Sequence, residues 1–199
     1  MANYCTLSDL KSAISINDSI SDTLLNSSIE AASRWIDGWC DRSFEAAGTA
    51  ATDRDFIPSG MYDTLFIDDA VQVTAVKIDE DVDRTFATSL LPVDYQLEPI
   101  NARSGGITFP YNRLVPNEDG YWPMWRGQAT VRVTARWGWP EIPDAVRQAC
   151  ILQSSRLFTR FDSPLGVAGF GDMGAMRVSR FADPDVELLL QPYRLVKYA

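Results

Sequence analysis

Histidine is absent from this chain of 199 residues. Its absence excludes histidine-based catalytic triads, histidine metal ligands and the usual general base near neutral pH. Lysine is scarce as well, because Lys11, Lys77 and Lys197 are the only lysines and none lies in a recognisable motif. Enzymatic chemistry would therefore have to rest on carboxylates, tyrosine or cysteine.

Cysteine and long apolar runs are also scarce. The three cysteines, Cys5, Cys40 and Cys150, do not have the spacing of metal ligands. Cys40 and Cys150 fall on predicted apolar helix faces, where cysteine acts as a small hydrophobic residue, so we expect a reducing compartment. No run approaches the ~18 apolar residues of a membrane span. The start lacks the basic and apolar regions of a signal peptide, so we expect neither a membrane nor a signal sequence.

The net charge of −9 is unevenly distributed. Residues 1–125 carry 8 basic and 20 acidic side chains, or −12, whereas residues 126–199 carry 10 basic and 7 acidic side chains, or +3. Tight binding to duplex DNA requires clustered Lys and Arg against the phosphates, which the acidic part argues against. An acidic surface suits solubility, or a channel that lets DNA pass without binding it.

The N-terminal third is predicted to be helical. Thr6 can cap a short helix over Leu7–Ile14, and Ser21 or Asp22 can cap a longer one that ends near Arg42. The longer helix has apolar residues at helical spacing. They are Leu25, Ile29, Ala32, Ile36 and Trp39. Residues 45–52, rich in Ala, Gly and Thr, are predicted to be a linker.

From Asp53 the apolar period changes to two, which is typical of strands. Strands are predicted at 64–67 and 71–78, the second with a slip in parity that indicates a bulge. Residues 86–97, with Pro92, are predicted to form an edge segment, and 104–106 a turn. The clearest strand is 128–137, whose alternation predicts one buried and one solvated face. Trp137 shares the parity of the buried face, so Trp137→Ala is expected to cost ~3–5 kcal/mol.

Helical patterns return after the strands. Pro143 suits the first turn of a helix that reaches Phe161, and Asp183 can cap a last helix that Pro184 opens and Pro192 ends. The predicted fold class is α+β, a small core of about four helices with a β-rich insertion between helix 2 and helix 3. The expected segments are 1–45, 46–140 and 141–199, with the first and last completing one core. The helices at 22–42 and 143–161 should pack together through their apolar stripes.

Three sequence patterns suggest a ligand-binding site, and none of them supports one on comparison with the known motif or the predicted burial. The stretch Asp79–Asp83 begins like a calcium loop, but Arg84 replaces the required Gly and Leu90 the bidentate Glu, which favours a solvated hairpin turn. The glycine-rich stretch 165–174 lacks the Gly-Lys-Ser/Thr ending of a phosphate loop. Trp122, Trp125, Trp137 and Trp139 suggest a sugar platform, but a role in the core or as a packing lid is favoured. No cofactor or metal is therefore expected.

Apolar and aromatic side chains on the loop 165–181 and the tail 192–198 are candidates for contacts with partners. The candidates are Phe170, Met173, Met176, Arg177, Phe181, Tyr193, Arg194 and Tyr198. Packing of the loop residues against their own helices is an equal alternative. Since Pro192 is predicted to end the last helix, a truncation after Gln191 is expected to leave the fold largely intact.

The order of four motifs carries a resemblance. They are Thr6–Asp9 at the start, Asp41–Phe44 at the end of the second helix, the phrase Gly138–Pro143 that opens a helix, and the close Asp183–Arg194. This order resembles the head–tail connector, or adaptor, proteins of tailed phages. The resemblance covers mainly residues 4–45 and 138–198.

The resemblance implies a structural virion protein and not an enzyme. It implies a ring, usually twelvefold, that docks under the portal protein, contacts the next neck or tail-completion protein, and extends the DNA channel without specific DNA binding. The protein would be assembled in the host cytoplasm and reside in the virion neck, with Tyr193–Ala199 contributing to portal docking. Two alternatives stay open, a carbohydrate-binding or baseplate-type β module that uses the tryptophans, and a carboxylate-based hydrolase.

Overall fold

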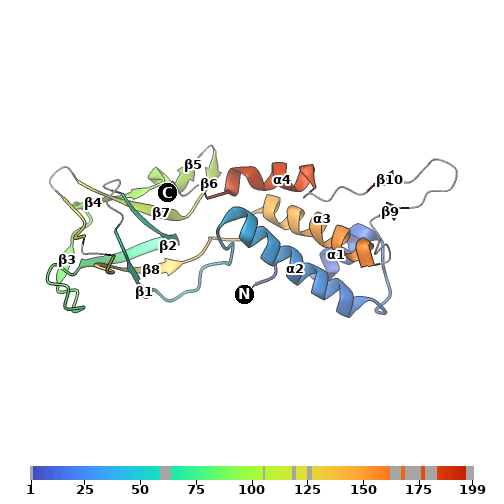
Figure 1. The fold of residues 1–199 in the computed structure, drawn as a ribbon, viewed down its shortest axis with the longest axis horizontal. Helices are drawn as coiled ribbons and strands as arrows, with labels where there is room; N and C mark the ends of the chain where they lie inside the picture. The colour runs from blue at the N-terminus through green and yellow to red at the C-terminus, as the bar shows by residue number, and fades with distance from the viewer. Residues whose placement is uncertain are drawn as a thin grey trace. The chain divides into compact units, whose positions relative to one another are not determined.

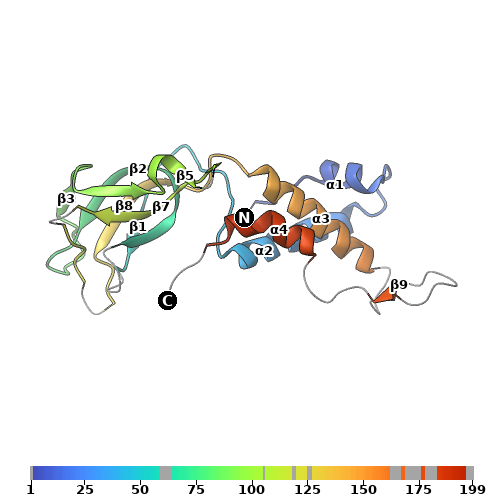
Figure 2. The same cartoon turned by 90° about the horizontal axis from the view of Figure 1, so that it is seen from above.

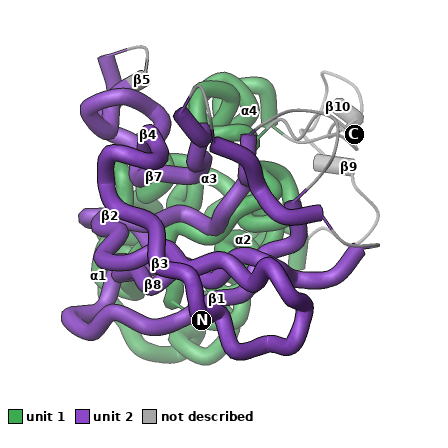
Figure 3. The backbone as a smooth tube through the Cα atoms, turned by 90° about the vertical axis from the view of Figure 1, so that its left-hand side faces the viewer, with its two compact units in different colours: residues 1–44, 142–199 green, residues 45–141 purple. Residues whose placement is uncertain are grey.

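The chain forms two compact units, one of residues 1–44 with 142–199 and the other of residues 45–141 (Figures 1 and 3). The computed structural model describes residues 2–58, 64–104, 106–117, 120–124, 127–161, 167–168, 176–177 and 183–195. In these ranges the first unit holds four α-helices, and the second holds a six-stranded antiparallel sheet between helices α2 and α3. The predicted α+β fold class is confirmed.

The helical unit, residues 1–44 and 142–199, is built from short and medium helices. They are α1 (Leu7–Ile14), α2 (Asp22–Cys40), α3 (Asp144–Phe161) and α4 (Pro184–Leu190), which continues into the 3-10 turn η2 (Gln191–Tyr193). The short strands β9 (Val167–Ala168) and β10 (Met176–Arg177) pair between α3 and α4. The first helix therefore has the predicted bounds, and α2 ends two residues earlier than predicted.

Local hydrogen bonds explain where these helices begin. The Thr6 hydroxyl accepts a bond from the Asp9 amide at 3.1 Å, and the Asp9 carboxylate accepts one from the Thr6 amide at 2.9 Å. This reciprocal capping box satisfies amides that the first turn leaves unpaired. Asp183 caps α4 with a single bond, since its carboxylate accepts the amide of Asp185 at 3.0 Å. Ser21 occupies the N-cap of α2 but makes no capping bond with its side chain.

Helix α3 is the centre of the helical unit and packs against α1, α2 and α4 (Figure 2). Leu25, Ile29 and Ile36 of α2 and Val146 of α3 are buried in this packing. The predicted contact between the second and third helices is thus confirmed. Apolar stripes at a spacing of three and four residues explain it, because each stripe is stable only when another helix covers it.

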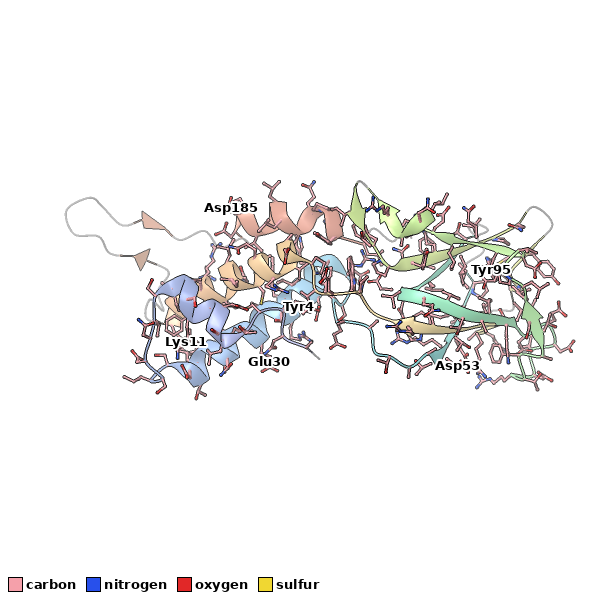
Figure 4. All side chains as sticks on the ribbon, turned by 180° about the vertical axis from the view of Figure 1, so that it is seen from behind. Tyr4, Lys11, Glu30, Asp53, Tyr95 and Asp185 are labelled. Carbon is pink, nitrogen blue, oxygen red and sulfur yellow. The ribbon has the colours of Figure 1, made fainter. Side chains whose placement is uncertain are left out.

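Tyr4 ties the N-terminal segment to the helices and lies among them in Figure 4. Its amide donates to Ser33 Oγ at 3.1 Å, its hydroxyl donates to the Asp37 carboxylate, and it accepts the amide of Phe44 at 2.9 Å. Burial, followed by the bond to Asp37, raises the pKa of Tyr4 to about 12. One buried tyrosine therefore ties the N-terminal segment to the C-terminal half of α2 and to the residue Phe44 that follows it.

The sheet unit, residues 45–141, has the strand order β1-β8-β2-β7-β4, with β3 also paired to β2. The strands are β1 (Thr52–Phe56), β2 (Leu65–Ile78), β3 (Thr88–Leu90), β4 (Tyr95–Glu98), β7 (Tyr111–Pro116) and β8 (Val131–Trp137). The 3-10 turn η1 (Ile100–Ala102) leads into a separate hairpin of β5 (Arg103–Ser104) and β6 (Ile107–Thr108). The segment after β3 supplies the edge strand β4, as predicted.

Strand β2 is one long strand where two were predicted. Its pairing register shifts between Phe66 and Ala70 on the β7 side, and twice between Ala70 and Ala75 on the β8 side. These irregularities confirm the bulge that the parity slip predicted. Ile78, at the end of β2, lines the same groove as Pro116 of β7. Pro116 lies two residues after Leu114, which pairs with Leu65 at the beginning of β2. The bulges therefore bend β2 back on itself, so that both of its ends reach one end of the sheet.

The core of the sheet unit lies on one face of β8. Val131, Val133 and Ala135 are buried, in agreement with the predicted alternation. The prediction for Trp137 is wrong in degree, because its ring is only half-buried at the rim of this core. It packs on Phe56 with ring centroids 5.6 Å apart. Truncation of Trp137 to alanine is therefore expected to cost less free energy of unfolding than truncation of a fully buried ring.

Two predictions about polar segments need correction. Residues 52–56 were not predicted as a strand, and they form the edge strand β1. Most of its side chains are polar, so the segment shows no alternation of apolar and polar residues. The predicted solvated turn at Asp79–Arg84 does join β2 to β3, but Asp79 is buried. Its carboxylate accepts the amides of Asp83 at 3.3 Å and Arg84 at 2.8 Å. The acidic stretch therefore shapes a turn through side-chain-to-backbone bonds.

The phrase Gly138–Pro143 has a structural explanation in the sheet unit. Gly138 has φ +117°, and a Cβ there would lie 2.6 Å from the Glu45 carbonyl oxygen. This close approach lets the Trp139 amide donate to the Glu45 carbonyl at 2.8 Å while the buried indole donates to Asp69 at 3.0 Å. Only glycine fits both the backbone angle and the space.

We expect Gly138→Ala to destabilise the sheet unit by about 2–4 kcal/mol, because the new methyl group must displace backbone atoms. Denaturant unfolding followed by Trp fluorescence measures this change. Gly48→Ala is the matched control, since nothing lies within 4 Å of a Cβ at Gly48. Equal midpoints for the two variants would contradict the explanation.

Candidate assembly surfaces

The C-terminal segment is anchored to the helical unit by Tyr193. Its side chain is 7% exposed and lies edge-on to Phe44, with ring centroids 5.9 Å apart. Arg42 donates to the Tyr193 carbonyl at 3.3 Å, and burial raises the pKa of the Tyr193 phenol. Tyr193 is therefore a packing residue of the helical core. A tyrosine in this position orients the residues that follow it.

The residues after Tyr193 run along the end of α2. The Leu195 amide donates to the Cys40 carbonyl at 2.9 Å, and the Arg194 guanidinium lies over the Trp39 ring at 5.4 Å from its centroid. This arrangement overturns the premise that the fold ends at Gln191, because Tyr193, Arg194 and Leu195 supply core contacts and helix-end bonds. The orphan carbonyls at a helix end need such partners.

A groove of about 470 Å³ lies between the end of α2 and α4, and we call it the α4 groove. Its lining residues are Trp39, Pro184, Glu187, Leu188, Gln191 and Arg194. Leu188 is 70% exposed, and among the described residues the buried Nε1 of Trp39 has no hydrogen-bond partner. The groove thus combines apolar surface with charges of both signs, which is the composition of a protein-binding site.

The spacing of α4 explains why Leu188 faces outwards. Val186 and Leu190 are four positions apart and are both buried, so they define the inner face of the helix. Leu188 lies between them on the opposite face. From the sequence, Trp39 was predicted to lie on the apolar stripe of the second helix and Leu188 was not predicted as a contact residue. The three consecutive leucines 188–190 were a usable signal, because they cannot all lie on one face of a helix.

The sheet unit has a second groove, of about 490 Å³, at the end where β2 finishes. We call it the sheet-end groove; it is lined by residues of the β3–β4 and β7–β8 connections, with buried Trp122 among them. Exposed apolar side chains stand in the same two connections. They are Leu91 at 63%, Val93 at 68%, Tyr121 at 65% and Met124 at 58% exposure. An apolar cluster of this kind marks a contact surface.

The structure describes the side chains of only some of the eight predicted contact residues. Tyr193 and Arg194 are brought together with α2, as described above. Phe170, Met173, Phe181 and Tyr198 lie outside the described residues. Met176 and Arg177 belong to β10, for which only the backbone pairing with β9 is described. The structure therefore brings two of the eight candidates into one site.

The tryptophans of the proposed sugar platform do not form one. Trp139 is 1% exposed and Trp122 is 5% exposed, so both are core side chains, as favoured from the sequence. The Trp137 ring contacts Phe56, and the Arg54 guanidinium lies over it at 4.7 Å from the ring centroid. Trp125 is outside the described residues. Stacking of a sugar ring needs a free aromatic face, which the buried Trp122 and Trp139 do not offer and which the Arg54 guanidinium competes for at Trp137.

Arginines on the polar face of β8 are paired within the sheet unit. Arg132 donates to both carboxylate oxygens of Asp55, at 2.6 and 2.8 Å, and Arg136 donates to the Gly48 carbonyl at 3.0 Å. The bond to Arg132 lowers the pKa of Asp55, and the same bond raises the pKa of Arg132. A bidentate pair of this kind leaves little of the guanidinium for a phosphate.

No group of three or more Cys, Asp or Glu side chains in the described ranges is arranged to hold a metal ion. Within the same ranges, no helix has the length and apolar character needed to cross a membrane. The described surface includes a partly apolar groove on each unit. This arrangement suits association with other proteins.

The fold is similar to that of proteins in solved structures of gene transfer agent particles. The structure is similar to a neck protein in the "neck of empty GTA particle computed with C6 symmetry", with 14% identity, a TM-score of 0.56, and coverage of 98% of this chain and 92% of that chain. It is also similar to a protein in the "virion of native gene transfer agent (GTA) particle", with 16% identity, a TM-score of 0.51 and the same coverage of 98% and 92%. At these identities the likeness shows the fold. No curated protein matches the chain.

Residues 4–83 match the family of phage gp6-like head-tail connector proteins. The match spans α1, α2, β1 and β2, and so includes the capped N-terminal helices that carried the first part of the resemblance. The connector family is structural and not enzymatic, in agreement with grooves that suit proteins. Over residues 4–83, the chain is therefore similar to the phage gp6-like head-tail connector proteins.

Proposed function

We propose that this connector assembles as a ring in the neck of a phage-like particle, between the portal protein and the next neck or tail-completion protein. The observation that carries the proposal is the match to head-tail connectors over residues 4–83. The proteins with the same fold come from necks and virions of gene transfer agent particles, one computed with C6 symmetry. Rotational symmetry places copies of a subunit around one axis, and the family resemblance suggests twelve copies.

The two grooves offer the surfaces that such a ring needs. The α4 groove carries exposed Leu188 beside Arg194, at the start of the tail to which the resemblance assigns portal docking. We therefore propose that the α4 groove and the tail contact the portal. The sheet-end groove, with exposed Val93 and Tyr121, is then the surface for the neighbouring copy or the next neck protein.

The test is direct assembly. The purified protein is mixed with a candidate portal protein, and the mixture is imaged by negative-stain electron microscopy. Rings of the connector stacked coaxially on portal rings are the expected result. A connector that stays monomeric by light scattering, both alone and with portals from related phages, would contradict the proposal. The same preparation without the portal shows whether the ring forms unaided.

We expect no tight binding to duplex DNA at physiological salt. Arg132 and Arg136 are engaged within the sheet unit, and residues 1–125 carry a net charge of −12 from 8 basic and 20 acidic side chains. Fluorescence anisotropy with a labelled duplex measures the affinity as a function of salt. Submicromolar binding with a steep salt dependence would reveal a phosphate track. Arg126, which lies outside the described residues, would then be the first residue to substitute.

A further inference from the structure

Two of the three cysteines meet inside the helical unit. Cys5 precedes α1, Cys150 lies on α3, and their Sγ atoms are 3.3 Å apart. Both side chains are buried and both thiols are free. Cys40 is also buried and free, and desolvation raises the pKa of its thiol to about 12. The chain therefore contains one close thiol pair and one isolated thiol for comparison.

The position of Cys5 is set by bonds on both sides of it. The preceding amide, of Tyr4, donates to Ser33 Oγ at 3.1 Å, and the following residue, Thr6, caps α1. These bonds direct the Cys5 side chain towards α3. Because Cys5 belongs to a non-helical segment, local opening of that segment can admit a small molecule without unfolding of the unit.

Polar neighbours make the two thiols unequal. Cys150 Sγ lies 3.5 Å from Ser33 Oγ and 3.8 Å from Ser154 Oγ, in addition to its contact with Cys5. The hydrogen bond from Cys5 lowers the pKa of Cys150, with further help from the two hydroxyls, and the same bond raises the pKa of Cys5. Cys150, which has the two hydroxyls as additional polar neighbours, is therefore the thiol better placed to react as a thiolate. The thiolate is the form that reacts with oxidants.

We propose that Cys5 and Cys150 are a redox-sensitive pair that forms an intramolecular disulfide when the protein meets a hydroperoxide. The link would join the segment before α1 to α3, across a sequence separation of 145 residues that contains the whole sheet unit. None of the described grooves includes either cysteine, so the pair is separate from the assembly surfaces.

The reaction balances with hydrogen peroxide as the oxidant. The Cys150 thiolate attacks one peroxide oxygen, the O–O bond breaks, and the departing hydroxide takes up a proton to form water, which leaves a sulfenic acid on Cys150. Cys5 Sγ then attacks that sulfur, the S–O bond breaks, and the hydroxide leaves as a second water with the Cys5 proton. The two thiols lose two electrons in total, and one peroxide is reduced to two waters.

A link of this span should stabilise the helical unit, because it restricts the unfolded chain. We expect the melting temperature to rise on the order of 10 °C on oxidation. In the neck that we propose, the link would form after a particle leaves the reducing cytoplasm where it was assembled. This use rests on the proposed function, whereas the reaction itself does not.

The experiment uses the full chain, folded, with and without a brief treatment with hydrogen peroxide. Free thiols are then blocked at low pH, and the digest is mapped by mass spectrometry. A peptide pair joined through Cys5 and Cys150, with Cys40 blocked as a free thiol, is the expected result. The oxidised protein should also melt at the higher temperature and return to the lower one after reduction.

Three variants complete the test. Cys40→Ser should retain both the joined peptide and the thermal shift, whereas Cys5→Ser and Cys150→Ser should lose both. Free Cys5 and Cys150 in native, peroxide-treated wild type would overturn the proposal, as would equal linkage of Cys40. Because this readout uses the wild-type protein, it stands even where a serine variant fails to fold, and it is independent of ring formation.

Discussion

A truncation after Gln191 is expected to destabilise the helical unit by about 3–5 kcal/mol, the cost of removing a buried aromatic side chain. The truncation removes Tyr193, which packs on Phe44, and Leu195, whose amide bonds to the Cys40 carbonyl. Both the core and the end of α2 then lose partners. This reverses the expectation from the sequence, in which Pro192 already ended the fold.

Thermal unfolding followed by circular dichroism measures the effect. A truncation after Leu195 is the matched control, because it keeps every anchor described above and removes only residues 196–199. It should melt like the full chain, while the shorter protein melts at least several degrees lower. An unchanged melting temperature for the truncation after Gln191 would show that Tyr193 is not a core residue. The longer truncation also tests whether residues 196–199 serve portal docking, without the confounding loss of stability.

Leu188→Asp is expected to reduce the formation of portal–connector complexes by tenfold or more while leaving the melting temperature unchanged. Leu188 is 70% exposed, so the folded connector tolerates a carboxylate there. If the portal covers the α4 groove, that carboxylate would be buried against apolar surface without a partner, which is costly. The fraction of stacked rings, counted by electron microscopy at several portal concentrations, measures the loss.

Ile20→Asp is the control for Leu188→Asp. Ile20 is 90% exposed, belongs to the same unit, and does not line the α4 groove. Its variant should form complexes as the wild type does. Full complex formation by Leu188→Asp would move portal docking away from the α4 groove, and the loop 165–181 would become the next segment to substitute. Equal losses in both variants would indicate a general effect of added negative charge.

Local patterns predicted the helices and the clearest strand well. The capping box of Thr6 and Asp9 is a contact between residues three positions apart, and the start of α4 at Asp183 and Pro184 is equally local. The alternation of Val131, Val133 and Ala135 likewise depends on neighbours within a single strand. Such features follow from bonds and periodicities that a few consecutive residues decide.

The errors concern features that distant residues decide. Strand β1 is stabilised by Asp53 and Asp55, which bond to Thr134 and Arg132 of β8, and its own composition contains no apolar alternation. Trp137 has the parity of a core residue but lies at the rim, because the neighbouring strand β1 ends the sheet there. Parity reports the face of a sheet on which a side chain lies and carries no information about the distance to its edge.

The sequence by itself determined the order of the helices, the buried face of β8, the α+β class and the resemblance to connectors, because capping, apolar spacing and short motifs are local. Only the tertiary structure decided that Tyr193 is an anchor, that Leu188 and Trp39 share a groove, and that Cys5 meets Cys150. Each of these pairs residues far apart in the chain. Their contact depends on how α3 packs against α1, α2 and α4, which the apolar stripes favour but do not specify in detail.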